Sequence, residues 1–287
     1  MVKISVIVPV FNAGRYIDRC IVALLEQDYP RSNYEIIAVD NGSTDDSFDR
    51  LRRYPVKVVQ EPKLGSYAAR NAGLLHASGS LLGFTDADCV PCARWLTGID
   101  TVMDDLGTEI VLGERRFATR SALMRAVNDY EVSKDISVLK GTQRLKYYGY
   151  TNNLGMRRDT YDRYGPFIEC GRGADTIFVR NVVDNESCKA VCFSSDMVVD
   201  HLEMKVFKDY VKKMFIYGRS MQNYGKITPT QPLSFPESIE ILKTSARDGR
   251  YSAFMMPSLL LSLGVAFFAW QFGFWIGACE CVKNRRR

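Results

Sequence analysis

The chain has 287 residues, of which 46% are hydrophobic and 25% charged, so it can bury a substantial core as one large domain or a domain plus an appendage. The net charge of +5 is modest, and the basic residues gather toward the C-terminal half, which favours an anionic partner such as a phosphate or a membrane surface. No RNA-binding fingerprint, zinc-finger spacing or helix-turn-helix pattern occurs, so we expect no nucleic-acid partner.

Strand and helix patterns alternate over the first hundred residues. Apolar, buried-type strands are predicted at residues 4–8, 35–39, 56–60 and 81–85, with helical patterns between them. Near-continuous apolar strands separated by helices predict an α/β fold, in which a mostly parallel Rossmann-like sheet is covered by helices on both faces. In such sheets, ligands bind beyond the C-terminal ends of the strands.

Acidic residues follow two of these strands. Asp40 ends the second strand, and Asp86-Ala87-Asp88 follows the fourth. Two carboxylates spaced i, i+2 on an extended backbone point the same way, so the pair needs a positive partner. A hard divalent cation carrying a phosphorylated ligand is the natural candidate, and an acidic turn is the alternative. Asp40 and the Asp86/Asp88 pair are candidates for one crevice.

The pattern loosens after about residue 105. Short strands are expected at residues 110–113, 190–193 and 197–199, and a helix from Asp175 to Val183. Residues 203–218 predict an amphipathic helix with lysines away from its apolar face. This helix either lies on anionic lipid or packs against the core.

The C-terminal tail is different. No charged residue occurs from Ala253 to Ala278, a stretch long enough to span a bilayer. Basic residues flank both ends, which conflicts with the positive-inside tendency of a single span. We expect a membrane-associated segment, which either spans the bilayer, re-enters it or lies in its plane; a buried core helix is the alternative.

The eight cysteines are scattered along the chain. Cys89-Val90-Pro91-Cys92 has thioredoxin-like spacing, but no second pair completes a zinc site, so we expect reduced, buried thiols. The N-terminus runs directly into a strand rather than a signal peptide, which predicts a catalytic part in the cytoplasm.

Four motifs occur in order at characteristic separations: Val8-Pro9-Val10-Phe11-Asn12, Val39-Asp40-Asn41-Gly42-Ser43-Thr44-Asp45, Ala69-Arg70-Asn71-Ala72-Gly73 and Phe84-Thr85-Asp86-Ala87-Asp88. Together they resemble the nucleotide-sugar half of glycosyltransferase family 2, which has the GT-A fold. The resemblance continues through residues 153–158, the Gly165-Pro166-Phe167 turn, Gly173-Ala174-Asp175 and His201, and covers roughly residues 3–220.

The resemblance and the apolar tail together predict a domain plan. A catalytic domain occupies residues 1–225, with a nucleotide-binding half at 1–105 and an acceptor half at 106–225. Residues 226–250 form a linker, and residues 251–287 form the hydrophobic, membrane-associated tail.

The resemblance also implies the roles of individual residues. Nucleotide-sugar binding falls to Pro9, Phe11, Asn12, Asp40, Arg70, Asp86 and Ala87. The metal ligands are Asp88, His201 and Asp86, and the ion is Mn²⁺ or Mg²⁺. Asp175 matches the general base, and Trp95 matches a position near the sugar.

Each role has a structural alternative. Phe11 could fill the core, Arg70 could form a surface salt bridge, and His201 could be a satisfied buried histidine. Asp175 could cap a helix, and Trp95 could serve in packing. His76, the second histidine, lies away from the motifs and is assigned to structure.

The implied activity is a metal-dependent, inverting transfer of a sugar from a nucleotide diphosphate sugar, UDP favoured over GDP, to a hydroxyl. A lipid-linked or cell-envelope glycan acceptor at the cytoplasmic face of the cell membrane would fit the apolar tail. The chain departs from the family at Ala174, where a Glu is usual. That departure favours one alternative, a catalytically silent, nucleotide-sugar-binding membrane scaffold.

Overall fold

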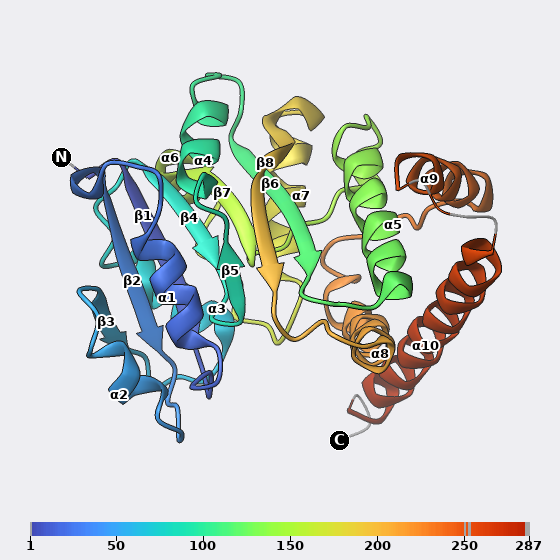
Figure 1. Ribbon diagram of the computed structural model, residues 1–287, viewed down its shortest axis with the longest axis horizontal. Helices are drawn as coiled ribbons and strands as arrows, with labels where there is room; N and C mark the ends of the chain where they lie inside the picture. The colour runs from blue at the N-terminus through green and yellow to red at the C-terminus, as the bar shows by residue number, and fades with distance from the viewer. Residues whose placement is uncertain (1, 250, 252–253, 285–287) are drawn as a thin grey trace. The chain divides into compact units, whose positions relative to one another are not determined.

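The computed structural model describes residues 2–249, 251 and 254–284 (Figure 1). The chain divides into two compact units. Unit 1 comprises Met1–Arg116 and Tyr148–Leu202, and unit 2 comprises Phe117–Tyr147 and Glu203–Arg287. The boundaries predicted at residues 105, 225 and 250 differ from this division and stay a prediction.

An eight-stranded mixed sheet organises unit 1, with the strand order β3-β2-β1-β4-β7-β6-β8-β5. The strands are β1 (Ile4–Val10), β2 (Tyr34–Asp40), β3 (Lys57–Gln60), β4 (Leu81–Thr85), β5 (Cys89–Pro91), β6 (Ile110–Phe117), β7 (Asn153–Arg157) and β8 (Val191–His201). The strands β1 to β4 pair in parallel, whereas β7 runs antiparallel to β4 and β6, and β5 runs antiparallel to β8. The predicted α/β fold is confirmed, and its antiparallel half begins at β7.

Helices cover both faces of this sheet, as the unbroken apolar strands require. The helices of unit 1 are α1 (Ile17–Leu25), α2 (Ser47–Leu51), α3 (Ser66–Leu74), α4 (Trp95–Met103), α6 (Arg158–Tyr164) and α7 (Ala174–Asn185), with 3-10 turns η1 (Arg31–Asn33) and η3 (Cys188–Ala190). Alternate β1 residues Ile4, Val6 and Val8 pack with residues of α1 and α4 in one core cluster. On the opposite face, a Cβ added at Gly73 of α3 would lie 2.8 Å from Ile7, so this helix packs directly on the sheet.

Glycine allows α4 to approach the sheet closely. Gly83 and Gly155 are cross-strand partners in β4 and β7. A Cβ at Gly83 would lie 2.9 Å from the ring of Trp95, and a Cβ at Gly155 would lie 3.0 Å from Ile99. Both side chains of α4 are fully buried. Because glycine has no side chain, Gly83 and Gly155 leave room for Trp95 and Ile99 of α4 to pack against the sheet.

The strands predicted in the first hundred residues are confirmed as β1–β4, and β1 continues through Pro9 to Val10. Residues 110–113 lie in β6, and the helix predicted from Asp175 is α7. Residues 191–193 and 197–199 form strand as predicted, but the break expected between them was wrong, because β8 is continuous over Val191–His201.

Unit 2 is helical, with α5 (Ala122–Leu139), η2 (Arg144–Lys146), α8 (Phe207–Tyr224), α9 (Phe235–Asp248) and α10 (Met255–Asn284). Its core joins Met124 of α5, Tyr210 of α8, Leu242 of α9 and Leu259 of α10. The amphipathic helix predicted at 203–218 is α8, displaced toward the C-terminus. Within the expected linker, α9 begins with a capping box in which Ser234 and Glu237 satisfy each other's backbone N–H groups.

The apolar tail forms a single helix in the described residues. Met255–Glu280 of α10 is long and apolar enough to cross a membrane, judged by length and composition alone.

Candidate active site

A polar clamp joins the loop after β1 to the loop after β2. Asn12, at φ 49°, accepts through Oδ1 the backbone N–H groups of Thr44 at 2.7 Å and Asp45 at 3.3 Å. Asp45 in turn accepts the N–H of Gly14 at 3.0 Å. Asparagine tolerates positive φ better than most residues, which suits this turn. The predicted residue Asn12 therefore fixes the loop after β1 against the loop after β2.

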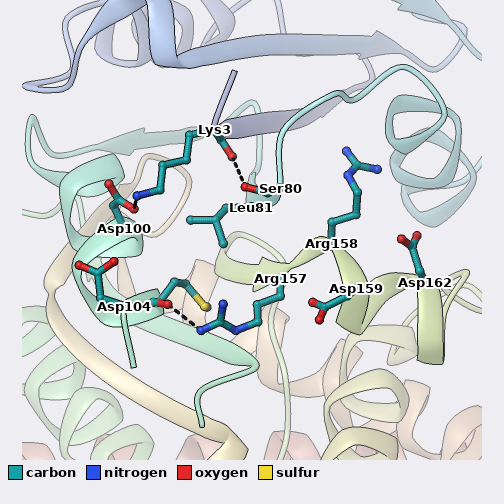
Figure 2. A pocket seen from close by; sticks show the side chains of 10 residues that line it. Lys3, Ser80, Leu81, Asp100, Asp104, Arg157, Arg158, Asp159 and Asp162 are labelled. Atoms are coloured by element: carbon teal, nitrogen blue, oxygen red, sulfur yellow. Dashed lines mark hydrogen bonds and ion pairs between the residues drawn. The ribbon is translucent and has the colours of Figure 1, made fainter. Parts of the chain in front are cut away.

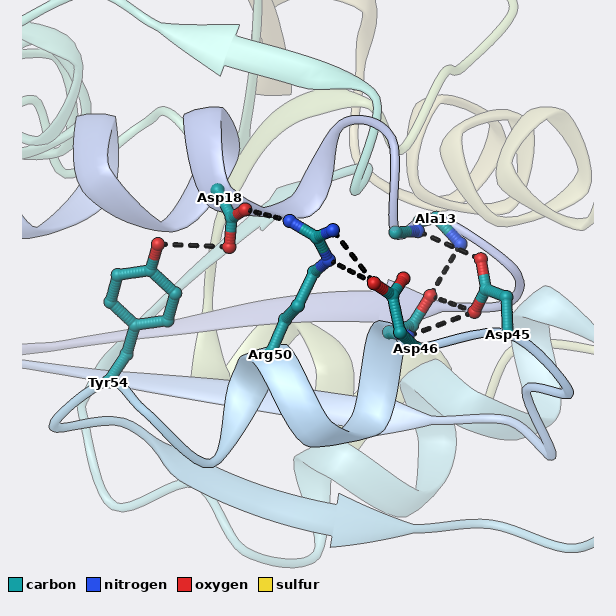
Figure 3. A network of polar contacts seen from close by, with 8 residues as sticks. Ala13, Asp18, Asp45, Asp46, Arg50 and Tyr54 are labelled. Atoms are coloured by element: carbon teal, nitrogen blue, oxygen red, sulfur yellow. Dashed lines mark hydrogen bonds and ion pairs between the residues drawn. The ribbon is translucent and has the colours of Figure 1, made fainter.

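Figure 3 shows how the clamp continues onto the neighbouring helices. The guanidinium of Arg50 on α2 joins Asp46 to Asp18 of α1, and Asp18 also accepts the hydroxyl of Tyr54 at 3.0 Å. This network fixes α1 and α2 beside the two loops, and its exposed ion pairs contribute little stability individually.

Asp40 and Phe11 differ in exposure at this edge. Asp40, the last residue of β2, is 3% exposed, and its Oδ1 accepts the N–H of Ser43 at 3.4 Å. Phe11 is 55% exposed, so the core-filler alternative for Phe11 was wrong. Pro9 lies within β1 opposite Val39. A buried carboxylate beside an exposed aromatic ring provides one hydrogen-bond acceptor and one stacking surface.

The segment Asp86-Ala87-Asp88 is a turn between β4 and β5, closed by the N–H of Cys89 donating to the carbonyl of Asp86 at 3.0 Å. The extended backbone assumed for the two carboxylates was therefore wrong. Ala87 packs into the core, and the two aspartates are held by different partners. Because of this tight turn after β4, Asp86 and Asp88 contact different side chains.

Arg70 forms an ion pair with Asp86. Its side chain is 3% exposed, against 34% for Asp86, so the surface-salt-bridge alternative for Arg70 was wrong. Arg70 also donates to the carbonyl of Ser66 at 3.1 Å and lies 5.3 Å from the centre of the Tyr67 ring. Its Nε is buried and makes no hydrogen bond within the described part of the chain. Arg70 is thus a buried guanidinium that pairs with Asp86 and keeps one donor without a protein partner.

Asp88 faces His201 across the β5–β8 pair. Cys89 and His201 are directly opposite in the antiparallel register, and Asp88 Oδ2 lies 3.4 Å from His201 Nδ1. The ligand atoms of Asp88, Cys89 and His201 all lie within 4.8 Å of one another. A carboxylate and an imidazole at this separation can share one divalent ion. The structure thus brings together two of the three predicted metal ligands.

Asp175 lies in the first turn of α7, directly after Ala174, where the helix dipole favours negative charge. Its Oδ1 accepts the N–H of Thr176 at 2.9 Å, and its Oδ2 accepts the N–H of Thr151 at 3.3 Å. Burial raises the pKa of Asp175 above its ordinary value, while these N–H groups and the Arg70 charge oppose that shift. Gly173 is the N-cap residue, so the capping alternative for Asp175 was wrong.

Tyr67 is a candidate site residue that the sequence motifs did not predict. Its ring is 5% exposed, its hydroxyl accepts the backbone N–H of Asp175 at 3.4 Å, and the same hydroxyl acts to lower the pKa of the Asp175 carboxyl. Burial, followed by the Asp175 charge, raises the pKa of Tyr67 well above its usual value, so the phenol stays protonated as a donor. Tyr67 therefore links Arg70 to Asp175. Its position three residues before Arg70 on one helix was the available signal.

Trp95 and His76 are placed in structural roles. Trp95 is fully buried, and its indole Nε1 donates to Asn153 Oδ1 at 2.8 Å. Asn153 in turn donates to the carbonyls of Glu114 and Met197, each at 2.8 Å. Of the two predicted alternatives, the structure supports packing for Trp95. His76 is exposed in the turn after α3.

A separate pocket lies at the opposite edge of the sheet, where β1 and β4 begin (Figure 2). Lys3, Leu81 and Arg157 line this cavity of about 510 Å³. Arg157 donates to the carbonyl of Met103 at 2.6 Å and to that of Thr108 at 2.8 Å, so it secures the end of α4. The predicted site residues lie at the other edge, and this pocket contains none of them.

Comparison with known proteins decides the family. A sequence model described as Glycosyl transferase family 2 matches residues 5–165, and Glycosyltransferase AglE of Haloferax volcanii is 30% identical over 75% of this chain and 72% of its own. The chain belongs to glycosyltransferase family 2. This family 2 glycosyltransferase is also similar to Glycosyltransferase GlyG of Streptococcus pneumoniae. The two are 33% identical over 38% of this chain and 38% of GlyG. It is a transferase enzyme.

Solved structures share its GT-A fold. The mannosyltransferase PcManGT from Pyrobaculum calidifontis, in complex with GDP-Man and Mn²⁺, matches with a TM-score of 0.66 and 21% identity over 93% of this chain and 73% of its own. Staphylococcus aureus TarS 1-349, in complex with UDP, matches with a TM-score of 0.58 and 20% identity over 93% and 80%. These likenesses establish the arrangement of the sheet and helices.

Proposed function

We propose that this family 2 enzyme is a metal-dependent, inverting glycosyltransferase that moves a sugar from a nucleotide diphosphate sugar to a hydroxyl. The observation that carries the proposal is the linked series Asp86–Arg70–Tyr67–Asp175, with Asp88 and His201 beside it. It supplies an anion-binding cation, a metal-type donor pair and a basic carboxylate at one edge of the sheet.

The donor occupies the ends of β1, β2 and β4 in this proposal. Asp40 accepts a hydrogen bond from the nucleobase, and the exposed ring of Phe11 packs on the base. Pro9, Asn12 and Ala87 shape the surrounding backbone. Comparison with TarS, whose structures hold UDP and UDP-GlcNAc, supports a UDP-sugar, whereas PcManGT holds GDP-Man.

Asp88 and His201 would hold the divalent cation, Mn²⁺ or Mg²⁺, and Asp86 is the third ligand that the family resemblance implies. Bound there, such a cation would supply Lewis-acid neutralisation of charge on the departing diphosphate. Glucosyl-3-phosphoglycerate synthase from Mycobacterium tuberculosis holds Mn²⁺ and UDP-Glc on the same fold, with a TM-score of 0.54 and 16% identity over 80% of this chain and 81% of its own. Arg70 neutralises the charge of Asp86 through their ion pair, which limits the repulsion between Asp86 and the diphosphate.

Asp175 removes the proton from the attacking acceptor hydroxyl as its oxygen bonds to the anomeric carbon and the diphosphate leaves from the opposite side. Burial raises the pKa of Asp175, which makes the carboxylate a stronger base. Tyr67 acts as a positioning residue, because its hydroxyl accepts the backbone N–H of Asp175 and counteracts the rise in the pKa of its carboxyl. Inversion follows from this single displacement.

A lipid-linked or cell-envelope glycan supplies the acceptor hydroxyl, at the cytoplasmic face of the cell membrane. Relatives named poly(ribitol-phosphate) beta-glucosyltransferase and a dolichyl-phosphate-linked glycan transferase support this acceptor class. The apolar helix α10 supports the membrane location.

Turnover of UDP-sugars with Mn²⁺ by the wild type and Asp175→Asn tests the proposal. We expect the variant to lose about 100-fold or more in rate while retaining UDP affinity, because an amide cannot accept the proton. Asp162→Asn, the same change on an exposed residue of the opposite-edge pocket, should leave the rate unchanged. Nucleotide binding without turnover by the wild type, over a panel of donors and acceptors, would instead favour the silent scaffold that Ala174 suggests.

A further inference from the structure

Helix α10 has two unlike faces along its length. A buried stripe follows helical spacing and consists of Leu259, Ser262, Ala266, Gly273 and Gly277. An exposed apolar stripe also follows i+3/i+4 spacing and consists of Leu261, Val265, Phe268, Phe272 and Trp275, which are 40% to 71% exposed. We call the second set the apolar stripe.

Other helices of unit 2 cover the buried stripe. A Cβ added at Gly218 of α8 would lie 1.9 Å from the carbonyl oxygen of Trp270, and one at Gly273 would lie 2.1 Å from that of Phe215. The two backbones are therefore in direct contact. Near the C-terminal end, Arg219 makes a two-pronged ion pair with Glu280, at 2.9 and 2.8 Å.

This packing conflicts with a membrane span. From residue 259 to 277 the buried stripe rises about 27 Å, close to the roughly 30 Å of a hydrocarbon core. If α10 crossed the bilayer, α8 would enter it too. Helix α8 carries five charged residues in its 18: Lys208, Asp209, Lys212, Lys213 and Arg219. Charges at bilayer depth are strongly unfavourable.

A re-entrant hairpin also conflicts with the structure, because α10 is one continuous helix over Met255–Asn284. Its apolar window nevertheless exposes two phenylalanines and a tryptophan along a single face. Monomeric soluble proteins rarely expose a contiguous apolar surface of this kind without a partner.

We propose that unit 2 binds an anionic bilayer in plane, with the apolar stripe of α10 in the boundary between headgroups and acyl chains. Positive charge in the same unit complements anionic headgroups. Lys208 and Lys212 are exposed on α8, and Lys283 and the sequence Arg285-Arg286-Arg287 follow the stripe along the chain. The inference deepens the membrane location given under Proposed function and uses no part of the transfer reaction.

Flotation of the full chain with vesicles tests the occupant of the stripe. We expect binding to vesicles of phosphatidylcholine mixed with phosphatidylglycerol, and weaker binding to phosphatidylcholine alone. Phe268→Ser with Phe272→Ser should lower the partition coefficient about 100-fold. Leu75→Ser with Leu106→Ser, at two 86% exposed positions in unit 1, should not change it.

Protease treatment of sealed vesicles tests the orientation. An epitope tag after Arg287 should be cleaved from the side that carries the catalytic unit, because an in-plane helix keeps both ends on one side. If protease added on the side of the catalytic unit did not cleave the tag, α10 would span the bilayer and the proposal would be overturned. The proposal would also be overturned if the wild type did not float and instead formed a dimer that the double Phe variant abolishes. In that case a second copy of this chain, rather than a bilayer, would cover the apolar stripe. Sugar-transfer activity is measured separately, so either proposal can fail alone.

Discussion

Tyr67→Phe tests whether Asp175 is the base and whether Tyr67 positions it. The substitution removes one hydroxyl from a ring that is 5% exposed and keeps the ring's contact with Phe167, whose centre lies 5.9 Å away. The Asp175 carboxylate then loses a donor, while the N–H groups of Thr151 and Thr176 remain. The substitution therefore removes the Tyr67 donor to the carboxylate and, with it, the acceptor of the Asp175 backbone N–H.

The direction and size of the expected pH effect follow from the loss of the Tyr67 donor to the Asp175 carboxylate. A donor to the charged form lowers a carboxyl pKa, so its removal raises the pKa of Asp175 further above its ordinary value. A hydrogen bond to a charged group contributes about 1.5–3 kcal/mol, and one pKa unit corresponds to about 1.4 kcal/mol. We expect the acidic limb of the kcat/KM profile to move up by about one pH unit, since the base acts when ionised.

The assay is UDP-sugar turnover as a function of pH, with the folded state checked by thermal unfolding. Tyr161→Phe is a matched control, because the Tyr161 ring also packs on Phe167 while its hydroxyl lies 3.5 Å from Asn71 Oδ1, away from Asp175. This control should leave the acidic limb in place. An acidic limb that stays fixed or moves down in folded Tyr67→Phe would refute the reasoning.

Three further outcomes are expected. Replacing His201 with Ala should weaken Mn²⁺ binding, measured by electron paramagnetic resonance, at least about tenfold, whereas unchanged affinity would make His201 structural. Trp95→Phe should lower the unfolding free energy by about 1–3 kcal/mol by leaving the buried Asn153 amide short of a donor, without raising KM for the donor sugar. Asp175→Asn should raise the unfolding free energy near neutral pH by about 1 kcal/mol, because burial disfavours the carboxylate. That advantage should shrink as the pH falls through the raised native pKa toward the ordinary value near 4, because protonation then stabilises the wild type; a constant gap would contradict it.

The parallel half of the sheet was predictable because each of its strands has a local sequence pattern typical of a buried strand. The runs at residues 4–8 and 81–85 are apolar on both faces, as strands under two layers of helices must be. Asp40 and the Asp86/Asp88 pair could be placed at one edge because parallel strands end together. The turn at residues 86–88 was not predicted, because the sequence Asp-Ala-Asp is compatible with both an extended segment and a turn. In the structure, the hydrogen bond from the N–H of Cys89 to the carbonyl of Asp86 closes the turn.

The antiparallel half lacked such signals. Strand β7 inserts between β4 and β6 through pairing with Leu81–Thr85, which lies some seventy residues earlier. Helix α5 was not predicted, because buried Asn128 and Asp135 interrupt its apolar face. Tyr67 contacts Asp175 from 108 residues away, so its spacing could mark it as a neighbour of Arg70 but could not reveal the hydrogen bond to Asp175.

The register of one short strand pair explains how the site is assembled from these two halves. Cys89 lies opposite His201 in the β5–β8 ladder, so the turn that carries Asp88 and the end of β8 are fixed by the same hydrogen bonds. The N–H of Leu202 extends this pairing by donating to the carbonyl of Asp88 at 2.9 Å. Because strand side chains alternate between faces, a slip of one residue in this pair would turn His201 away from Asp88 and separate the two donors. The position of His201 as a ligand is therefore a property of sheet pairing, and the short turn after β4 is what delivers Asp88 into that register.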